Sequence, residues 1–241
     1  SKIWPKVWDW AANEALVMRT AAACGLPTAE VFYEPHTRAC VVRRFDRWLR
    51  SDGTLGRLVQ YDFCQLAGVA SHGKYEAEGG PGIAQCAELI RRYSTQPALD
   101  LRHFLRWIFF NLYVGNNDSH AKNLALHQRV DGAVTLAPFY DLMCTRLYPA
   151  LSPHFAFALG GVTQPGAMTH VHLADLAQVL RMRPQFLLSE AQDLAHKMPA
   201  ALEAAMKSVA PVLPPAAADL AQRLKQFVQS NTRKTAARFR P

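Results

Sequence analysis

The segment 101–115, LRHFLRWIFFNLYVG, constrains the fold more than any other part of the chain. It is apolar on nearly every face, and a helix of that kind is buried at the centre of a domain. Directly behind it comes GNNDSHAKNLAL, residues 115–126, with an Asp, a His, a Lys and an Asn within six residues. An ordinary loop between two apolar segments does not need so many polar side chains. The pattern therefore predicts a buried helix that delivers a polar, chemically active loop.

Composition limits the class of protein. The 241 residues fit one large domain or two small ones, and 50% hydrophobic with 19% charged residues is an ordinary globular composition. No apolar run reaches the roughly 18 residues of a membrane span, and the first residues do not resemble a signal peptide, so we expect a cytoplasmic protein without membrane contact. The net charge of +8 favours an anionic partner, such as a nucleotide, nucleic acid or an acidic protein surface.

Two further features of composition lead to expectations. The five cysteines are scattered without a CxxC pair, which indicates reduced and mostly packed thiols rather than disulfides or a zinc site. Basic residues gather at 38–50, interleaved with Phe45 and Trp48, and again in the tail NTRKTAARFRP. We expect the tail to be a solvated, frayed terminus, with contact to nucleic acid as the alternative.

Periodicity predicts an α+β protein that is mainly α, in which a small strand-containing part precedes a large helical part. Strand pairs are expected at AEVFYE and ACVVRRF, around the turn PHTR, and at LALHQ and AVTLAPF, joined through Asp131 and Gly132. The residues 72–82 read as a Gly-rich loop. Helices are expected at 12–25, along the amphipathic segment 56–68, at 83–93, from 101, and at 171–181, 185–197, 199–210 and 215–231, with prolines between the last of these.

This arrangement predicts a site. The buried helix leads to Asp118, Asn123 follows five residues later, and the hairpin returns to PFYD, which places Asp141 close to Asn123. Oxygen ligands of this kind suit a magnesium ion and a phosphoryl acceptor. Protein kinases use the same order: a base, an Asn on a metal ion, and a second metal-binding Asp after a hairpin.

In that interpretation Asp118 is the base that orients the attacking hydroxyl, and Asn123 with Asp141 holds the metal. Lys122 could offset charge on the transferred phosphate, and His120 either braces the loop or shuttles a proton. A purely structural loop is the alternative, because Asp, Ser and Asn are common in turns and caps. A hydrolase triad and a metalloprotease site are not indicated, since neither G-x-S-x-G nor H-E-x-x-H occurs.

Four motifs in order, RRFDR, GKYEAEGGPGIA, NNDSHAKN and APFYDL, resemble the HipA-type serine/threonine kinases, the toxins of bacterial HipA/HipB toxin–antitoxin modules. The likeness runs from about Ala12 through Gly161. It implies a two-lobed kinase-like fold that uses ATP and Mg²⁺ to phosphorylate a protein hydroxyl. In the family, the substrate can be an aminoacyl-tRNA synthetase, whose inactivation arrests growth. The partner there is a HipB-like helix-turn-helix antitoxin that binds operator DNA.

The resemblance also assigns residues. Asp118 looks like the catalytic Asp, and Asn123 and Asp141 look like the metal ligands. The backbone around Arg43, Arg44 and Phe45 is similar to the hinge that receives adenine. Glu14 resembles the carboxylate that pairs with the nucleotide-binding Lys.

The chain departs from the family in two places. The family's V-E-R-F-D hinge is here Val42-Arg43-Arg44-Phe45-Asp46, which reverses one charge. The phosphate-covering loop and its Lys should lie just upstream of this chain, and Lys2 and Lys6 are the nearest substitutes. We therefore expect a fragment, with a protein that has lost part of its nucleotide lobe as the alternative. In either case residues 1–50 are expected to be a remnant of the N-terminal lobe and hinge, and 51–241 the helical C-terminal lobe.

Two expectations remain open in the sequence. The loop GKYEAEGGPG either packs behind the hinge or contacts nucleotide or substrate. As for function, the alternative to an active kinase is a catalytically impaired, kinase-like binding module that associates with a helix-turn-helix repressor.

Overall fold

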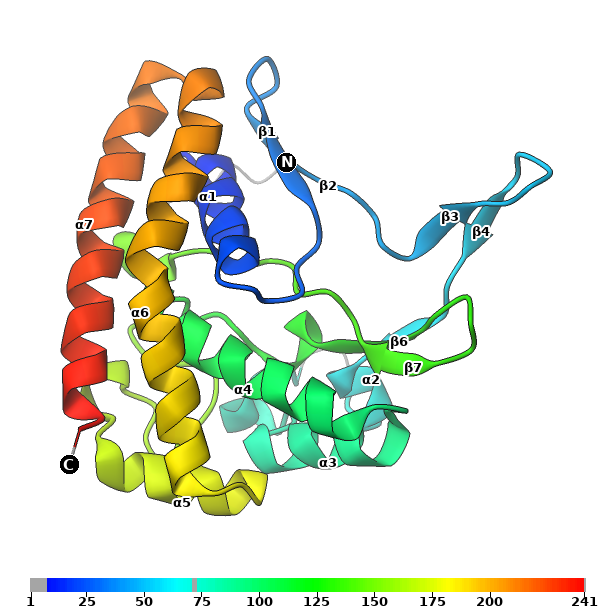
Figure 1. Ribbon diagram of the computed structural model, residues 1–241, viewed down its shortest axis with the longest axis vertical. Helices are drawn as coiled ribbons and strands as arrows, with labels where there is room; N and C mark the ends of the chain where they lie inside the picture. Colours follow the sequence, from blue (N-terminus) through cyan, green and yellow to red (C-terminus); the bar gives the residue numbers. More distant parts are fainter. Residues whose placement is uncertain (1–7, 71–72, 241) are drawn as a thin grey trace.

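The computed structural model describes residues 8–70 and 73–240. It confirms the mainly helical α+β fold: two long helices, α6 and α7, lie side by side, α1 packs against both, and α4 packs against them from the centre of the molecule (Figure 1). The α-helices are α1 Trp10–Ala23, α2 Phe63–Leu66, α3 Ile83–Tyr93, α4 Pro97–Val114, α5 His170–Leu180, α6 Pro184–Val209 and α7 Pro215–Arg238. Short 3-10 turns occur at Glu76–Glu78, Ala121–Asn123, Thr145–Leu147, Pro165–Ala167 and Ala210–Val212.

Helix α4 is the buried helix that the sequence predicts. Its residues from 104 to 114 are all buried. It begins at Pro97, whose missing N–H costs nothing at this position, and Asp100 in its first turn accepts a hydrogen bond from the backbone N–H of Leu136 at 2.8 Å. It ends at Gly115, which adopts φ +72°, a left-handed conformation that suits glycine. The chain thus leaves α4 sharply and enters the polar loop.

The strands form three small sheets. They are β1 Val31–Glu34, β2 Ala39–Val42, β3 Arg47–Leu49, β4 Leu55–Arg57, β5 Gln60–Asp62, β6 Ala125–Gln128 and β7 Val134–Leu136. Both predicted hairpins are confirmed: β1 pairs with β2 (Val31 opposite Val42), and β6 pairs with β7 (Leu126 opposite Leu136). The β3–β4 hairpin projects away from the helices and was not predicted (Figure 1). Strand β5 extends the sheet of β6 and β7, in the order β5-β6-β7.

The amphipathic helix expected at 56–68 is wrong for most of its length. Residues up to Asp62 form the strands β4 and β5, and α-helix is confined to Phe63–Leu66. Asp62 starts this helix, because its carboxylate accepts a hydrogen bond from the backbone N–H of Gln65, while the Gln65 side chain accepts one from the N–H of Asp62. That capping box fixes the start of the helix, and pairing with β6 holds the residues before it in a strand.

Two expectations for the C-terminal region are also wrong. Pro199 does not separate two helices but lies inside α6, which continues from Pro184 to Val209. A proline there removes one helical hydrogen bond, and packing of α6 against α1, α4 and α7 offsets the loss. The tail is not frayed, since α7 runs to Arg238 and Phe239 is buried, with its ring 5.9 Å from that of Phe109.

The cysteines are mostly packed thiols, as the sequence predicts. All five cysteines are free thiols, and four of them are buried. Among the residues described, no helix combines the length and the apolar character that crossing a bilayer requires.

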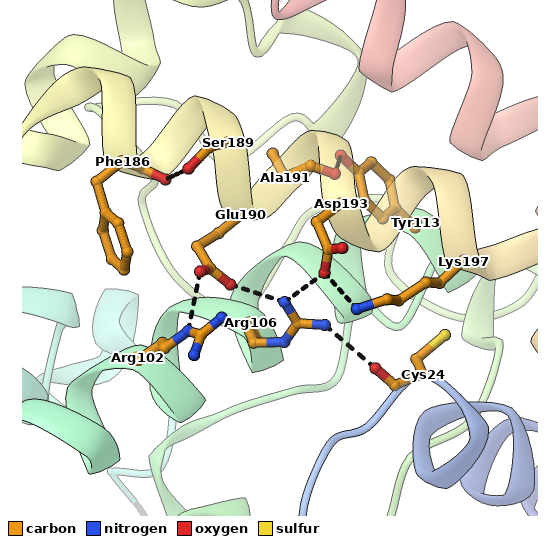
Figure 2. A network of polar contacts seen from close by, with 10 residues as sticks. All are labelled: Cys24, Arg102, Arg106, Tyr113, Phe186, Ser189, Glu190, Ala191, Asp193 and Lys197. Atoms are coloured by element: carbon orange, nitrogen blue, oxygen red, sulfur yellow. Dashed lines mark hydrogen bonds and ion pairs between the residues drawn. The ribbon is translucent and has the colours of Figure 1, made fainter.

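A buried ion-pair network holds α4 against α6 and the end of α1 (Figure 2). The Arg106 guanidinium of α4 donates to Glu190 at 2.7 Å and to Asp193 at 2.9 Å, both on α6, and to the Cys24 carbonyl at 3.1 Å. Arg102, one turn earlier, donates to the other Glu190 oxygen at 2.9 Å. The side chains of Arg106 and Glu190 are 6% and 7% exposed, whereas that of Arg102 is 51% exposed.

Besides Glu190 on α6, the carboxylate of Glu14 on helix α1 is also buried. Burial, reinforced by the negative charge of Asp141, raises its pKa from 4.5 to about 7, while a hydrogen bond with Cys40 opposes the shift. The neighbouring Asn13 is fully buried and pairs with the backbone of Cys144, donating to its C=O at 2.9 Å and accepting from its N–H at 2.8 Å. Helix α1 therefore brings polar groups to the segment that follows Asp141.

Replacement of Arg106 tests the network. Arg106→Met should lower the free energy of unfolding by about 3 kcal/mol, because it leaves the Glu190 carboxylate buried with less compensation. Arg102→Met is the matched control, because Arg102 lies on the same helix and pairs with the same Glu190 but is exposed. This change should lower the free energy of unfolding by about 1 kcal/mol or less. Urea unfolding measures both. Equal losses would show that burial of Arg106 is not what matters.

Glu14 should make stability depend on pH. A carboxyl whose pKa is higher in the folded state stabilises the fold while protonated, so this contribution is complete below pH 4.5 and is lost as the pH rises through about 7. Between pH 5 and pH 8, we expect the wild type to lose about 2 to 3 kcal/mol relative to Glu14→Gln. Urea unfolding of both proteins at the two pH values measures the difference. Parallel pH profiles would contradict the expectation.

Candidate active site

The loop after α4 exposes one residue and buries its neighbours. From 111 to 121 every residue is buried except Asp118, whose side chain is 51% exposed. Backbone contacts hold its main chain: the Asp118 C=O accepts from the N–H of His120 at 3.0 Å and from the Asn123 side chain at 3.3 Å. The loop thus presents a single carboxylate to solvent from a fixed backbone.

Asn123 and Asp141 are brought together with Asp118, as the sequence analysis expected. Asn123 lies at the end of the turn that leads into β6, and Asp141 follows the bridge between Phe139 and Thr28. Desolvation raises the pKa of the Asp141 carboxyl, and the charge of Asp118 raises it further, whereas Lys74 and a hydrogen bond with Asn123 lower it. Asp141 also has a φ of +57°, an uncommon left-handed conformation for a residue other than glycine.

The donor set fits magnesium. Mg²⁺ binds carboxylate and amide oxygens and keeps water or phosphate oxygens in its other positions, so Asn123 and Asp141 are sufficient protein ligands. The raised pKa of Asp141 supports this, because it reports negative charge crowded in a partly desolvated place that a cation would relieve. Among the described residues, no three His, Cys, Asp or Glu side chains gather in a way that could hold a metal by themselves.

The expected hinge joins β2 to β3. The Arg43 guanidinium pairs with Glu30 at 2.8 Å and that of Arg44 with Asp46 at 2.6 Å, and both arginine side chains are more than half exposed. Phe45 packs inward, with its ring 6.2 Å from Tyr140 and 5.8 Å from His127. Within the described parts of the chain, the backbone N–H and C=O groups of Arg44 and Phe45 have no hydrogen-bond partner. Such groups are suited to receive a planar base.

Glu14, His120 and Lys122 occupy different places around this site. Glu14 lies near Asp141 from the side of α1. His120 is buried, which lowers its pKa, and its Nδ1 atom has no hydrogen-bond partner among the residues that the structure covers. Lys122 lies in the turn Ala121–Asn123, where its C=O accepts a hydrogen bond from the Tyr140 hydroxyl at 2.8 Å. The catalytic, metal and nucleotide roles of all these residues stay predictions.

Sequence reasoning missed the residues that touch Asp118. The Tyr75 hydroxyl donates to the Asp118 Oδ1 atom at 2.5 Å, and the Lys74 ammonium lies 4.0 Å from the same oxygen. Both belong to the Gly-rich loop, whose packing behind the hinge was one of two expectations. The loop reaches the predicted base across 43 residues of sequence, a contact that neither expectation included. The signal in the sequence that could have pointed to this contact was the adjacent pair Lys74 and Tyr75, in a loop segment without hydrophobic periodicity.

Known proteins resemble this chain in sequence and in structure. The sequence pattern of the HipA-like C-terminal domain matches residues 1–209. A Sinorhizobium fredii protein called "Putative kinase Y4mE" is 46% identical over 152 residues, which cover 61% of this chain and 36% of that protein. The serine/threonine-protein kinase toxin HipA of Shewanella oneidensis is 28% identical over 203 residues, 79% of this chain and 47% of the toxin. The chain thus spans less than half the length of these two relatives.

Solved structures resemble the fold over nearly the whole chain. HipA from the Shewanella oneidensis complex of HipA, HipB and operator DNA superposes with a TM-score of 0.80 at 25% identity, covering 97% of this chain and 56% of HipA. The Helicobacter pylori proinflammatory kinase CtkA superposes with a TM-score of 0.62 at 11% identity, covering 95% of this chain and 84% of CtkA, which shows a shared fold. The match over residues 1–209 and these likenesses lead to one conclusion: the chain belongs to the HipA-like C-terminal domain family, a family of kinase-like proteins.

Proposed function

We propose that this chain carries the catalytic region of a serine/threonine protein kinase that transfers the γ-phosphate of ATP to a protein hydroxyl. The observation that supports it most is the meeting of Asp118, Asn123 and Asp141 at the exit of the buried helix α4. These three residues come from a loop, a turn and the segment after a hairpin, and they gather at the one exposed residue of the polar loop.

Each residue has a role in the proposed reaction. The Asp118 carboxylate accepts the proton of the attacking hydroxyl, for which its exposure beside a rigid backbone is suited. Asn123 and Asp141 hold Mg²⁺, which neutralises charge on the phosphates when bound. The backbone of Arg43, Arg44 and Phe45 receives adenine, and Glu14 supports the nucleotide-binding Lys. Lys122 offsets phosphate charge. His120 braces the loop, in keeping with its burial, which lowers its pKa.

The likeness to HipA of Shewanella oneidensis supports further parts of the proposal. That protein is named as a toxin and was solved with HipB and operator DNA. We propose that the protein is a growth-arresting toxin that binds a HipB-like helix-turn-helix partner and associates with operator DNA through that partner. A translation-related protein, such as an aminoacyl-tRNA synthetase, is the proposed substrate. The division into an N-lobe remnant at 1–50 and a C-lobe at 51–241, and a cytoplasmic location, remain predictions.

A second candidate is a kinase-like binding module that associates with the same type of partner without turnover. The basic segment 38–50 favours it, because exposed arginines suit contact with an anionic partner surface, such as the operator DNA of a repressor complex. The Arg43 and Arg44 side chains in this segment are 75% and 62% exposed.

Loss of a carboxylate tests the catalytic assignment. In the natural full-length protein, Asp118→Asn and Asp141→Asn should each lower ATP turnover roughly 10²- to 10⁴-fold. Asp131→Asn is the matched control, an exposed Asp in the turn of the β6–β7 hairpin that should leave turnover unchanged. ADP formation, measured with casein as a protein acceptor, gives the rates. Wild-type rates in both site variants would refute the assignment.

Magnesium dependence separates the two candidates. For a kinase, calorimetry should show ATP binding that strengthens when Mg²⁺ is added, and Asp141→Asn should remove that increase, because it loses an anionic ligand. The binding module predicts no ATP-dependent heat and no turnover, together with tight association to a helix-turn-helix protein. ATP binding by the wild type that does not depend on magnesium would contradict the assignment of Asn123 and Asp141 as magnesium ligands.

A further inference from the structure

The Asp118 side chain is held from outside its own loop. Its backbone is fixed by His120 and Asn123, but these contacts involve the carbonyl group and leave the carboxylate free to rotate. The contacts to the carboxylate come from Tyr75 and Lys74, at 2.5 Å and 4.0 Å, and both end on the Oδ1 atom. One oxygen is therefore oriented by a phenol and an ammonium, and among residues 8–70 and 73–240 no hydrogen bond or ion pair ends on the Oδ2 atom, which suits it to accept a proton.

The Tyr75 ring contacts two neighbours. The Lys74 ammonium lies 4.7 Å from the centre of the ring, and the His120 ring packs in a T-shaped arrangement, with ring centroids 5.3 Å apart and an interplanar angle of 76°. Burial and the hydrogen bond to Asp118 both raise the pKa of the Tyr75 phenol, so the hydroxyl stays protonated and donates at physiological pH. A two-torsion aromatic side chain held in this way loses little freedom on contact with the carboxylate.

The loop that carries Tyr75 is closed by its own backbone. The N–H groups of Glu78 and Gly80 donate to the Tyr75 carbonyl at 3.0 Å and 2.8 Å. A Cβ atom at Gly80 would lie 2.8 Å from the carbonyl oxygens of Gly73 and Tyr75, so only glycine permits this closure. The Glu76 carboxylate accepts from the Ala158 N–H at 2.7 Å and anchors the loop to the segment beyond Asp141.

From these contacts we infer that Tyr75 is a positioning residue of the proposed phosphoryl transfer, which holds the Asp118 carboxylate in the orientation that receives the acceptor's proton. The inference rests on the proposed function and adds to it a residue from a different segment of the chain. It acts through Asp118 and touches neither Asn123, Asp141 nor the hinge. Its removal should therefore affect the chemical step and leave nucleotide binding unchanged.

The test is Tyr75→Phe in the natural full-length protein, with Tyr93→Phe as a matched control whose half-exposed ring lies by Arg92 and away from the site. ADP formation with casein present should show a kcat at least fivefold lower for Tyr75→Phe, at an unchanged KM for ATP and an unchanged melting temperature. Gly80→Ala, which displaces the loop but keeps the phenol, should lower kcat in the same way.

Each result decides between distinct conclusions. A kcat for Tyr75→Phe within twofold of the wild type would overturn the inference, and so would an increase, because the phenol would then compete with the acceptor. A fall in kcat together with a higher KM for ATP or a lower melting temperature would also overturn the inference, because it would indicate a general structural effect. The proposed function fails separately, if Asp118→Asn keeps wild-type turnover.

Discussion

The buried guanidinium of Arg106 fixes the arrangement on which the rest of the molecule depends. A charge with so little solvent contact is tolerated only where its partners are placed for it, and Arg106 finds them on α6 and at the C-terminal end of α1. Because a cation on α4 is satisfied by groups on α6 and at the end of α1, few relative positions of these three helices are possible. The direction in which α4 delivers Gly115 and Asp118 follows from that restriction.

The second determinant of the site is the placement of negative charge. Asp118, Asp141 and Glu14 come from three separate segments. Burial raises the pKa of both Glu14 and Asp141, and the charge of Asp141 raises that of Glu14 further, while the charge of Asp118 raises that of Asp141 further. Packing alone would not favour such a cluster. Such a cluster of carboxylates fits the proposed binding of a divalent cation and a polyphosphate, because the cation would be bound by oxygen ligands that are already in place. Lys74 supplies one positive charge at its rim.

Sequence reasoning succeeded where a short range of residues determines the outcome. The continuous apolar run specified α4, the turn residues Asp131 and Gly132 specified the β6–β7 hairpin, and together they brought Asn123 to Asp141. It failed where distant contacts decide. Pro199 ends a helix by local rules, yet packing on three neighbouring helices keeps α6 intact. The segment 56–68 has helical amphipathicity, yet pairing with β3 holds residues 56–57 in a strand and pairing with β6 holds residues 60–62 in another. Tyr75 could not be connected to Asp118, because nothing local links residues 43 positions apart.

The end of α4 has a feature that its own sequence does not provide. Its last carbonyls, those of Leu112 and Tyr113, accept hydrogen bonds from the Asn231 side chain of α7 at 2.8 Å and 2.9 Å. A Cβ atom at Gly115 would lie 2.6 Å from the Phe227 ring of the same helix. Helix α7 begins at Pro215, beyond the residues 1–209 that match the family pattern. The point where the polar loop leaves α4 is thus completed by a helix that the family sequence pattern does not reach, whereas the structural likeness to HipA covers 97% of the chain. The boundary of the family sequence pattern and that of the structural unit therefore do not coincide.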